Sequence, residues 1–181
     1  MFFLKELTRE LLLPPAYLGP KIKETIRRRL IEEVEGTCLG KYGYVITVTE
    51  VKEEGMKTGV ISNEFGEVIF HISYDAICFR PFKGEVLDAN VTVVTELGFF
   101  AEVGPLQVFV SRHAMPQDLQ EGFDAANEVW VSEDKEVELR QGCGVRLRIM
   151  GLSVDAADIS AIGTIKDDYL GLISAAEQVM A

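Results

Sequence analysis

Residues 87–111, with the sequence LDANVTVVTELGFFAEVGPLQVFVS, decide the fold of the second half of this chain. Apolar and polar residues alternate over 87–93 and again over 106–111, which predicts two half-buried β-strands. Residues 98–103 predict a third strand between them. Two later runs of the same kind lie at residues 145–149 and 159–165. Five short strands with one long connection after the third are typical of an OB barrel.

The connection between the third and fourth predicted strands covers residues 116–138. It holds eight acidic side chains, and Lys135 is its one basic residue. We interpret it as a long polar insertion between these two strands, without a convincing helix.

The first half predicts a helix packed on a small antiparallel sheet. Apolar residues recur every four positions from Ile22 to Val34, so residues 21–35 predict one amphipathic helix that ends at Gly36. Pro14-Pro15 and Gly19-Pro20 interrupt the chain before it. The predicted strands of this half are residues 2–7, 44–49, 68–73 and 76–79. The fold class is therefore α+β, with a boundary placed between Arg80 and Pro81.

The charge of the chain excludes a strong nonspecific grip on nucleic acid. The net charge is −11, with 11 basic and 12 acidic side chains in residues 1–80 but 7 and 17 in residues 81–181. Proteins that bind nucleic acid mainly by neutralising phosphates are basic. Any contact with RNA must therefore be local and modest.

Catalysis and metal binding find no support in the sequence. Gly40-Lys41-Tyr42-Gly43 is too short for a phosphate-binding loop, and the only histidines, His71 and His113, lack triad or metal-site spacing. Asp167-Asp168 is better read as a solvated turn or a partner contact. We expect no cofactor and no metal. Three sparse cysteines favour a reducing compartment, nuclear or cytosolic, and the N-terminus does not read as a signal peptide.

Aromatic and cationic residues of the predicted barrel are candidates for RNA contact. Phe99 and Phe100 follow each other on one strand, so one faces the core while the other faces outward, where a base can stack. The hypothesis is a small surface for single-stranded RNA, and the alternative is a packed aromatic core with solvated arginines. The candidate residues are Phe99, Phe100, Phe109, Arg112, His113, Arg146 and Arg148.

The glycine-bounded stretch from Gly55 to Gly66 predicts two turns at one end of the sheet of the first half. Such turns are usually plain connections, but exposed Met56 and Phe65 could insert into a partner surface. The candidate docking residues are Gly55, Met56, Lys57, Gly59, Asn63, Phe65 and Gly66. Arg27-Arg28-Arg29, on the predicted helix, is interpreted as a solvated face.

Short segments in order along nearly the whole chain resemble the family of the seventh subunit of eukaryotic RNA polymerase II, a relative of an archaeal polymerase stalk subunit. Each segment is short, but their combination is highly specific. The segments are Tyr17-Leu18-Gly19-Pro20, Val34-Glu35-Gly36-Thr37-Cys38, Gly40-Lys41-Tyr42-Gly43-Tyr44-Val45, Phe79-Arg80-Pro81-Phe82-Lys83-Gly84-Glu85, Gly98-Phe99-Phe100, Gly104-Pro105 and Asp167-Asp168-Tyr169-Leu170-Gly171.

The resemblance implies a nuclear, non-catalytic stalk subunit with two domains. Residues 1–80 would form a truncated RNP-like domain whose tip, residues 55–66, docks on the polymerase core near the clamp. Residues 81–181 would form an OB barrel of the ribosomal S-one type. The resemblance further implies a heterodimer with the fourth subunit, binding of nascent single-stranded RNA near the exit channel, and a role in transcription initiation.

Within this family pattern, residues 98–103 and 107–113 are the RNA-facing strands. This chain has Leu97 where the S-one pattern has an aromatic residue, and Ser111 where it usually has histidine. The departures favour weak contact with any emerging transcript over tight or sequence-specific binding.

Two other functions remain open from the sequence. A free-standing OB-fold RNA-binding regulator predicts a monomer and a more basic barrel. The stalk subunit of a sister polymerase, archaeal or another nuclear enzyme, predicts a similar sequence throughout.

Overall fold

The computed structural model describes residues 1–62, 66–135 and 137–173. The chain divides into two compact units, Met1–Arg80 and Pro81–Ala181, and each is described by itself. None of the described helices is long and apolar enough to cross a membrane.

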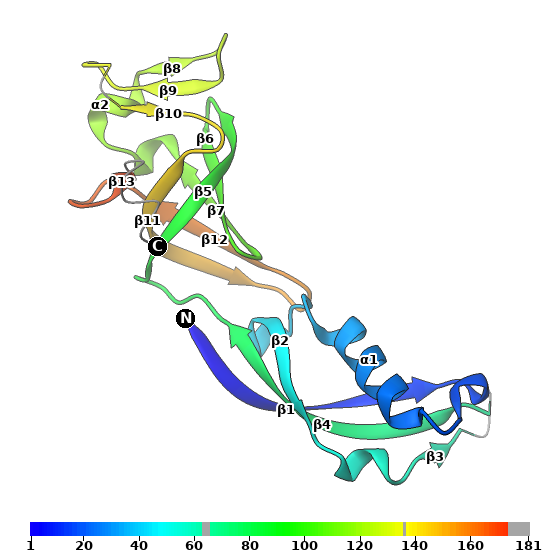
Figure 1. Cartoon of the computed structure of the whole chain (residues 1–181). Helices are drawn as coiled ribbons and strands as arrows, with labels where there is room; N and C mark the ends of the chain where they lie inside the picture. The colour runs from blue at the N-terminus through cyan, green and yellow to red at the C-terminus, as the bar shows by residue number, and fades with distance from the viewer. Residues whose placement is uncertain (63–65, 136, 174–181) are drawn as a thin grey trace. The chain divides into compact units, whose positions relative to one another are not determined.

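Unit 1, Met1–Arg80, is built on an antiparallel sheet with β4 at its centre (Figure 1). Strand β1 (Phe2–Leu13) pairs with β4 (Val68–Phe79) along its whole length. On the other side of β4 lie β2 (Tyr44–Val51) and the short β3 (Val60–Ile61). The described residues of this unit also form the 3-10 turns η1 (Pro15–Tyr17), η2 (Gly40–Tyr42) and η3 (Glu54–Met56).

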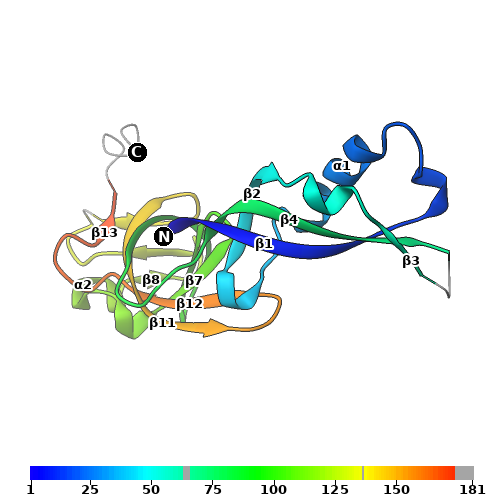
Figure 2. The same cartoon turned by 90° about the horizontal axis from the view of Figure 1, so that it is seen from below.

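Helix α1 (Ile22–Val34) covers one face of this sheet. Ile26, Leu30 and Val34 are buried, and they share one apolar core with inward residues of β1 and β4 such as Leu11 and Ile72. The predicted helix and the fold class, a helix on an antiparallel sheet, are confirmed. None of the described elements of unit 1 itself lies over the opposite face of the sheet (Figures 1 and 2).

Two strands of unit 1 are longer than predicted. Strand β1 continues six residues past the predicted end at Leu7, because Leu11 and Leu13 remain in the core although Arg9 interrupts the apolar face. Arg9 reaches Glu33 of α1 at 3.8 Å instead. Strand β4 is continuous through Tyr74, which is buried, so the two predicted strands of this stretch are one.

Unit 2 contains the predicted five-stranded barrel. Its strands are β5 (Val86–Thr95), β6 (Gly98–Val103), β7 (Leu106–Ser111), β11 (Gly144–Val154) and β12 (Ile159–Thr164). They follow the order β12-β7-β6-β5-β11, and the pairing of β11 with β12 closes the barrel. The β12–β7 pair is parallel and the others are antiparallel. Strand β13 (Gly171–Leu172) adds to the start of β11.

The acidic connection between β7 and β11 contains regular secondary structure, which the sequence did not predict. After η4 (Arg112–Ala114) come α2 (Gln117–Gln120) and a small sheet of β8 (Phe123–Asp124), β9 (Val129–Val131) and β10 (Glu138–Leu139), drawn at one end of the barrel in Figure 1. Trp130 and Leu139 are fully buried. The Phe123 and Trp130 rings of neighbouring strands lie 4.9 Å apart, so the acidic composition of this segment hid a few well-packed apolar side chains.

Candidate nucleic-acid interface

Four apolar side chains form a row across the outer surface of the barrel, defined here as the apolar row: Val93, Phe100, Phe109 and Ile162. Strand register joins them one to the next, because Val93 lies opposite Phe100, Phe100 opposite Phe109, and Phe109 opposite Ile162. Val93 is 49% and Ile162 55% exposed, and the two rings are half-buried. The Phe100 and Phe109 centroids lie 4.8 Å apart with their planes tilted by 43°.

The two neighbouring phenylalanines of β6 have opposite positions. Phe99 is fully buried in the barrel core, while Phe100 faces outward. Phe99 is therefore corrected from the set of candidate RNA-contacting residues to the core. Gly98, at the start of β6, has φ +149°, and a Cβ there would lie 2.1 Å from the Val110 carbonyl oxygen, so no other residue fits without a backbone shift.

The two arginines of β11 are engaged with carboxylates on neighbouring segments. Arg146 donates from Nε to Asp88 Oδ1 at 2.7 Å and from Nη2 to Oδ2 at 3.0 Å. This guanidinium holds the pKa of Asp88 below its usual range. Arg148 donates from Nη1 to Asp167 Oδ2 at 2.7 Å. Contact with a phosphate would therefore compete with an existing ion pair at either position.

The strand register places Arg148 closer to the apolar row than Arg146. Arg148 lies opposite Thr164, two residues from Ile162 along β12, and thus beside the apolar row. Arg146 lies opposite Asp88, five positions along β5 from Val93, or ~16 Å at ~3.3 Å per residue. Of the two arginines, Arg148 is therefore the one next to the apolar row, on its Ile162 side and two strands away from Phe109.

Arg112 and His113 follow β7 in the exposed turn η4. The Arg112 N–H donates to the Leu97 carbonyl at 2.9 Å, and the Ile165 N–H donates to the Ala114 carbonyl at 3.0 Å, so both sides of the turn are anchored. Leu97, where the S-one pattern has an aromatic residue, is 76% exposed. Within the described part of the chain no ion pair involves the Arg112 guanidinium, so it remains available to a phosphate at the end of β7, three residues beyond Phe109.

The predicted docking tip differs from expectation at Met56, which is buried, because η3 turns it into the core of unit 1. Gly55 packs against the backbone of β4, where a Cβ would lie 2.0 Å from the His71 carbonyl oxygen. Lys57 and Gly59 are exposed. Asn63 and Phe65 fall outside the described residues, and Gly66 is exposed with φ +68°.

The exposed apolar side chains near this tip are Val60 and Ile61 of β3, at 56% and 68%. Neither residue is among the docking residues predicted from the sequence. Their position as a β-branched pair between Gly59 and the next turn was the available signal.

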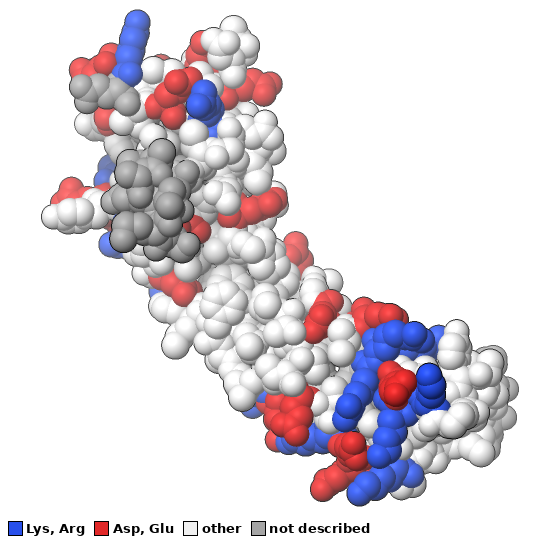
Figure 3. Space-filling view, viewed as in Figure 1, with Lys and Arg blue, Asp and Glu red and all other residues white. Residues whose placement is uncertain are grey.

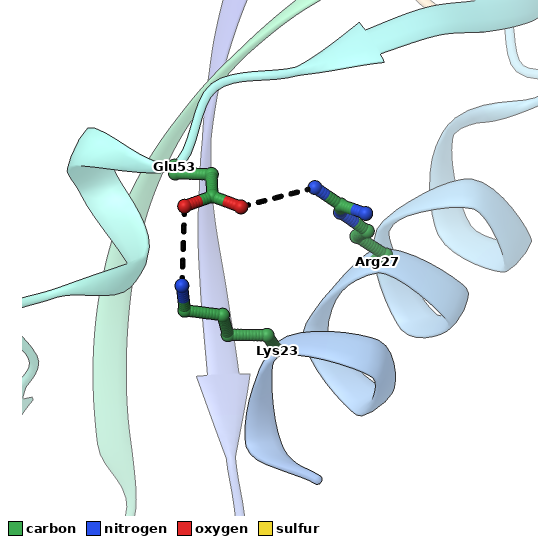
Figure 4. A network of polar contacts seen from close by, with 3 residues as sticks. All are labelled: Lys23, Arg27 and Glu53. Carbon is green, nitrogen blue, oxygen red and sulfur yellow. Dashed lines mark hydrogen bonds and ion pairs between the residues drawn. The ribbon is translucent and has the colours of Figure 1, made fainter.

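An ion-pair network ties η3 to α1 (Figure 4). Lys23 Nζ donates to Glu53 Oε2 at 3.1 Å and Arg27 Nη2 reaches Glu53 Oε1 at 3.5 Å. The hydrogen bond from Lys23 lowers the pKa of the Glu53 carboxyl.

The other basic residues of α1 also have partners. Arg28 lies 3.9 Å from Glu32, and the Arg29 guanidinium lies 4.5 Å from the Tyr17 ring centroid. The basic side chains Lys23, Arg27, Arg28 and Arg29 of α1 (Figure 3) therefore have partners within unit 1, and Lys23 and Arg27 link the helix to the segment that leads into η3.

Among residues 1–62, 66–135 and 137–173, no group of three or more His, Cys, Asp or Glu side chains is arranged to hold a metal ion. Cys78 is buried, and burial raises the pKa of its thiol.

Both halves of the chain match known families. Residues 8–71 match the family described as the SHS2 domain found in the N terminus of Rpb7p/Rpc25p/MJ0397, and residues 80–161 match the S1 RNA binding domain.

Curated relatives match over nearly the full length. DNA-directed RNA polymerase II subunit rpb7 of Dictyostelium discoideum is 47% identical, over 96% of this chain and 99% of that protein. Subunit RPB7 of Saccharomyces cerevisiae is 39% identical, over 96% and 100%. The archaeal subunit Rpo7 of Sulfolobus acidocaldarius is 24% identical, over 93% and 91%. The polymerase II proteins are thus the nearer relatives, and the chain belongs to the Rpb7 family of RNA polymerase II subunits.

Proposed function

We propose that this chain is the non-catalytic stalk subunit of nuclear RNA polymerase II and that its barrel contacts nascent single-stranded RNA near the exit channel. The observation that supports RNA contact best is the apolar row, with the Phe100 and Phe109 rings side by side on the outer barrel surface.

The row suits nucleobases more than phosphates. Stacking of one base on an aromatic ring contributes about 1–3 kcal/mol and is tolerant of sequence. Arg112, three residues beyond Phe109 in the turn after β7, supplies a single cation for the backbone. Because unit 2 is strongly acidic, the affinity has to come from stacking, and binding is modest and weakly dependent on salt.

Unit 1 supplies the protein contacts in this proposal. On the sheet face opposite α1, Phe2 and Leu4 are 62% and 64% exposed, with Ile77 beside Leu4 on β4. We define these three residues as the open-face patch. Its partner is the fourth polymerase subunit, since a heterodimer interface is where large exposed apolar side chains are expected.

The tip is assigned to the polymerase core near the clamp, with Lys57, Val60 and Ile61 as its exposed contacts. Through this attachment the subunit would support transcription initiation. The ion pairs of Glu53 with Lys23 and Arg27 hold the base of the tip against α1 and so pre-organise it.

The test is photocrosslinking of nascent transcripts to the subunit in assembled polymerase. Phe100→Ala with Phe109→Ala should lower crosslinking roughly tenfold or more, because two stacking surfaces are lost. Phe82→Ala is the matched control, since Phe82 is half exposed and lies outside the row. Equal crosslinking by wild type and the double variant, with the subunit retained on the polymerase, would refute the RNA contact.

A further inference from the structure

A groove of about 450 Å³ lies between the outer side of β5 and the small acidic sheet. One wall is made by β5, and the other by the β8–β9 turn, β10 and the segment that leads into β11. Its lining residues are Thr92, Val93, Val94, Asn127, Glu128, Val129, Glu138, Arg140 and Gln141.

The groove continues the apolar row. Val93 is the last member of the row and also lines the groove, so a strand of RNA stacked on Phe109 and Phe100 leads directly to it. The bulge at Thr92 turns Val93 outward, since both Val91 and Val94 are buried. The next nucleotide along the row therefore meets the groove.

The polar lining of the groove fits a base better than a phosphate. Two carboxylates, Glu128 and Glu138, face one guanidinium, Arg140, so the local charge is negative and repels phosphate. Carboxylates accept hydrogen bonds and donate none when ionised. They select a base edge with adjacent donors, which guanine presents at N1–H and its 2-amino group, while Arg140 can donate to the guanine O6.

The wall that holds Glu128 is built with a fixed geometry. Asp124 accepts the Ala126 N–H at 2.9 Å and the Asn127 side-chain amide at 2.7 Å. Glu128 itself has φ +55°, a conformation that residues other than glycine seldom adopt. The turn therefore presents its carboxylate from a defined backbone rather than from a loose loop.

We propose that this groove binds one guanine base of the transcript, with Glu128 and Glu138 as acceptors for its donor edge. The inference rests on the proposed RNA contact and adds a base preference to it. Glu128, Glu138 and Arg140 were not among the residues named from the sequence, because the acidic stretch reads as a solvated insertion.

The experiment titrates the full chain with oligouridine RNAs that hold a single guanosine, inosine or adenosine. Guanosine should bind roughly tenfold tighter than adenosine, with inosine between them because it lacks the 2-amino group. Glu128→Gln with Glu138→Gln should bring the three affinities together. Glu133→Gln with Asp134→Asn is the matched control: both acids are exposed in the β9–β10 turn, outside the groove, and the preference should persist.

The outcomes separate this inference from the proposed function. Equal affinity for guanosine and adenosine, together with weaker binding by Phe100→Ala, overturns the guanine groove and leaves the RNA contact in place. Uniformly tighter binding of all three RNAs by the Glu128 and Glu138 variant, with the preference unchanged, shows a charge effect only and also overturns the groove. Absence of RNA binding by wild type overturns both.

Discussion

The two units expose apolar side chains in different patterns. In unit 1 the sheet is open, so one face is buried under α1 and the other presents Phe2 and Leu4 of β1, with Ile77 of the neighbouring β4, as a compact patch. In unit 2 the sheet closes on itself, so its interior takes most of the apolar side chains of the strands, and the apolar row crosses the outer surface one residue per strand. A compact apolar patch suits contact with a protein surface, whereas a row that includes two adjacent rings suits the stacking of successive bases.

The largest expected effect tests whether the two units are stable independently. Leu30→Ala removes a fully buried side chain beneath α1 and should destabilise unit 1 by about 2–5 kcal/mol. Trp130, the only tryptophan, lies in unit 2 and reports its unfolding separately. In urea, the helix signal in circular dichroism should be lost earlier while the Trp130 fluorescence midpoint stays unchanged. A common shift of both midpoints would show that the units unfold together.

An effect of intermediate size tests whether the open-face patch and the apolar row bind different partners. Leu4→Asp places a charge in the open-face patch and should weaken capture of the fourth subunit at least tenfold, because a charge buried in an apolar interface is left unpaired. Crosslinking to RNA should not change per assembled subunit. Leu97→Asp, at a more exposed site in unit 2, is the control and should assemble normally. Full assembly of the Leu4 variant would move the interface elsewhere.

The smallest effect concerns the seam between β5 and β11. Asp88→Asn removes the charge that Arg146 neutralises, and both side chains are about two-fifths exposed, so the cost at pH 7 is under about 1 kcal/mol. Because the folded-state pKa of Asp88 is lowered, the stabilisation is present at neutral pH and is lost as pH falls through that pKa. The difference in unfolding free energy from wild type should shrink below about pH 4. A difference independent of pH would show that the ion pair contributes nothing.

The sequence predicts much of this fold because its strongest patterns are local. The spacing of Ile22, Ile26 and Leu30 is enough for α1, and the alternation in β5 and β7 is enough for barrel strands. The full extent of β1 depends instead on its partner, since Arg9 breaks the pattern and only pairing with Ile72 on β4 maintains the strand. The small sheet around Trp130 was missed because a few buried side chains are enough to order a mostly acidic segment.

The candidate site was harder to predict than the fold. Two successive phenylalanines on a strand must face opposite sides, but the choice of Phe100 as the outer one depends on register. Likewise, Asp88 and Arg146 are far apart in sequence, and only the pairing of β5 with β11 brings them together. The groove beside Val93 is formed by β5 of the barrel and two segments of the small acidic sheet, so no single stretch of sequence predicts it.

The pairing of β1 with β4 has a consequence for the synthesis of the protein. Phe2 lies opposite Phe79, so β1 is synthesised well before β4, its pairing partner and the last strand of its unit. At about 5–20 residues per second, that interval is roughly 4–15 s. During this time the leucines of β1 lack their strand partner and are available to molecular chaperones. Folding of unit 1 is thus expected as one late event, after most of its chain has been made.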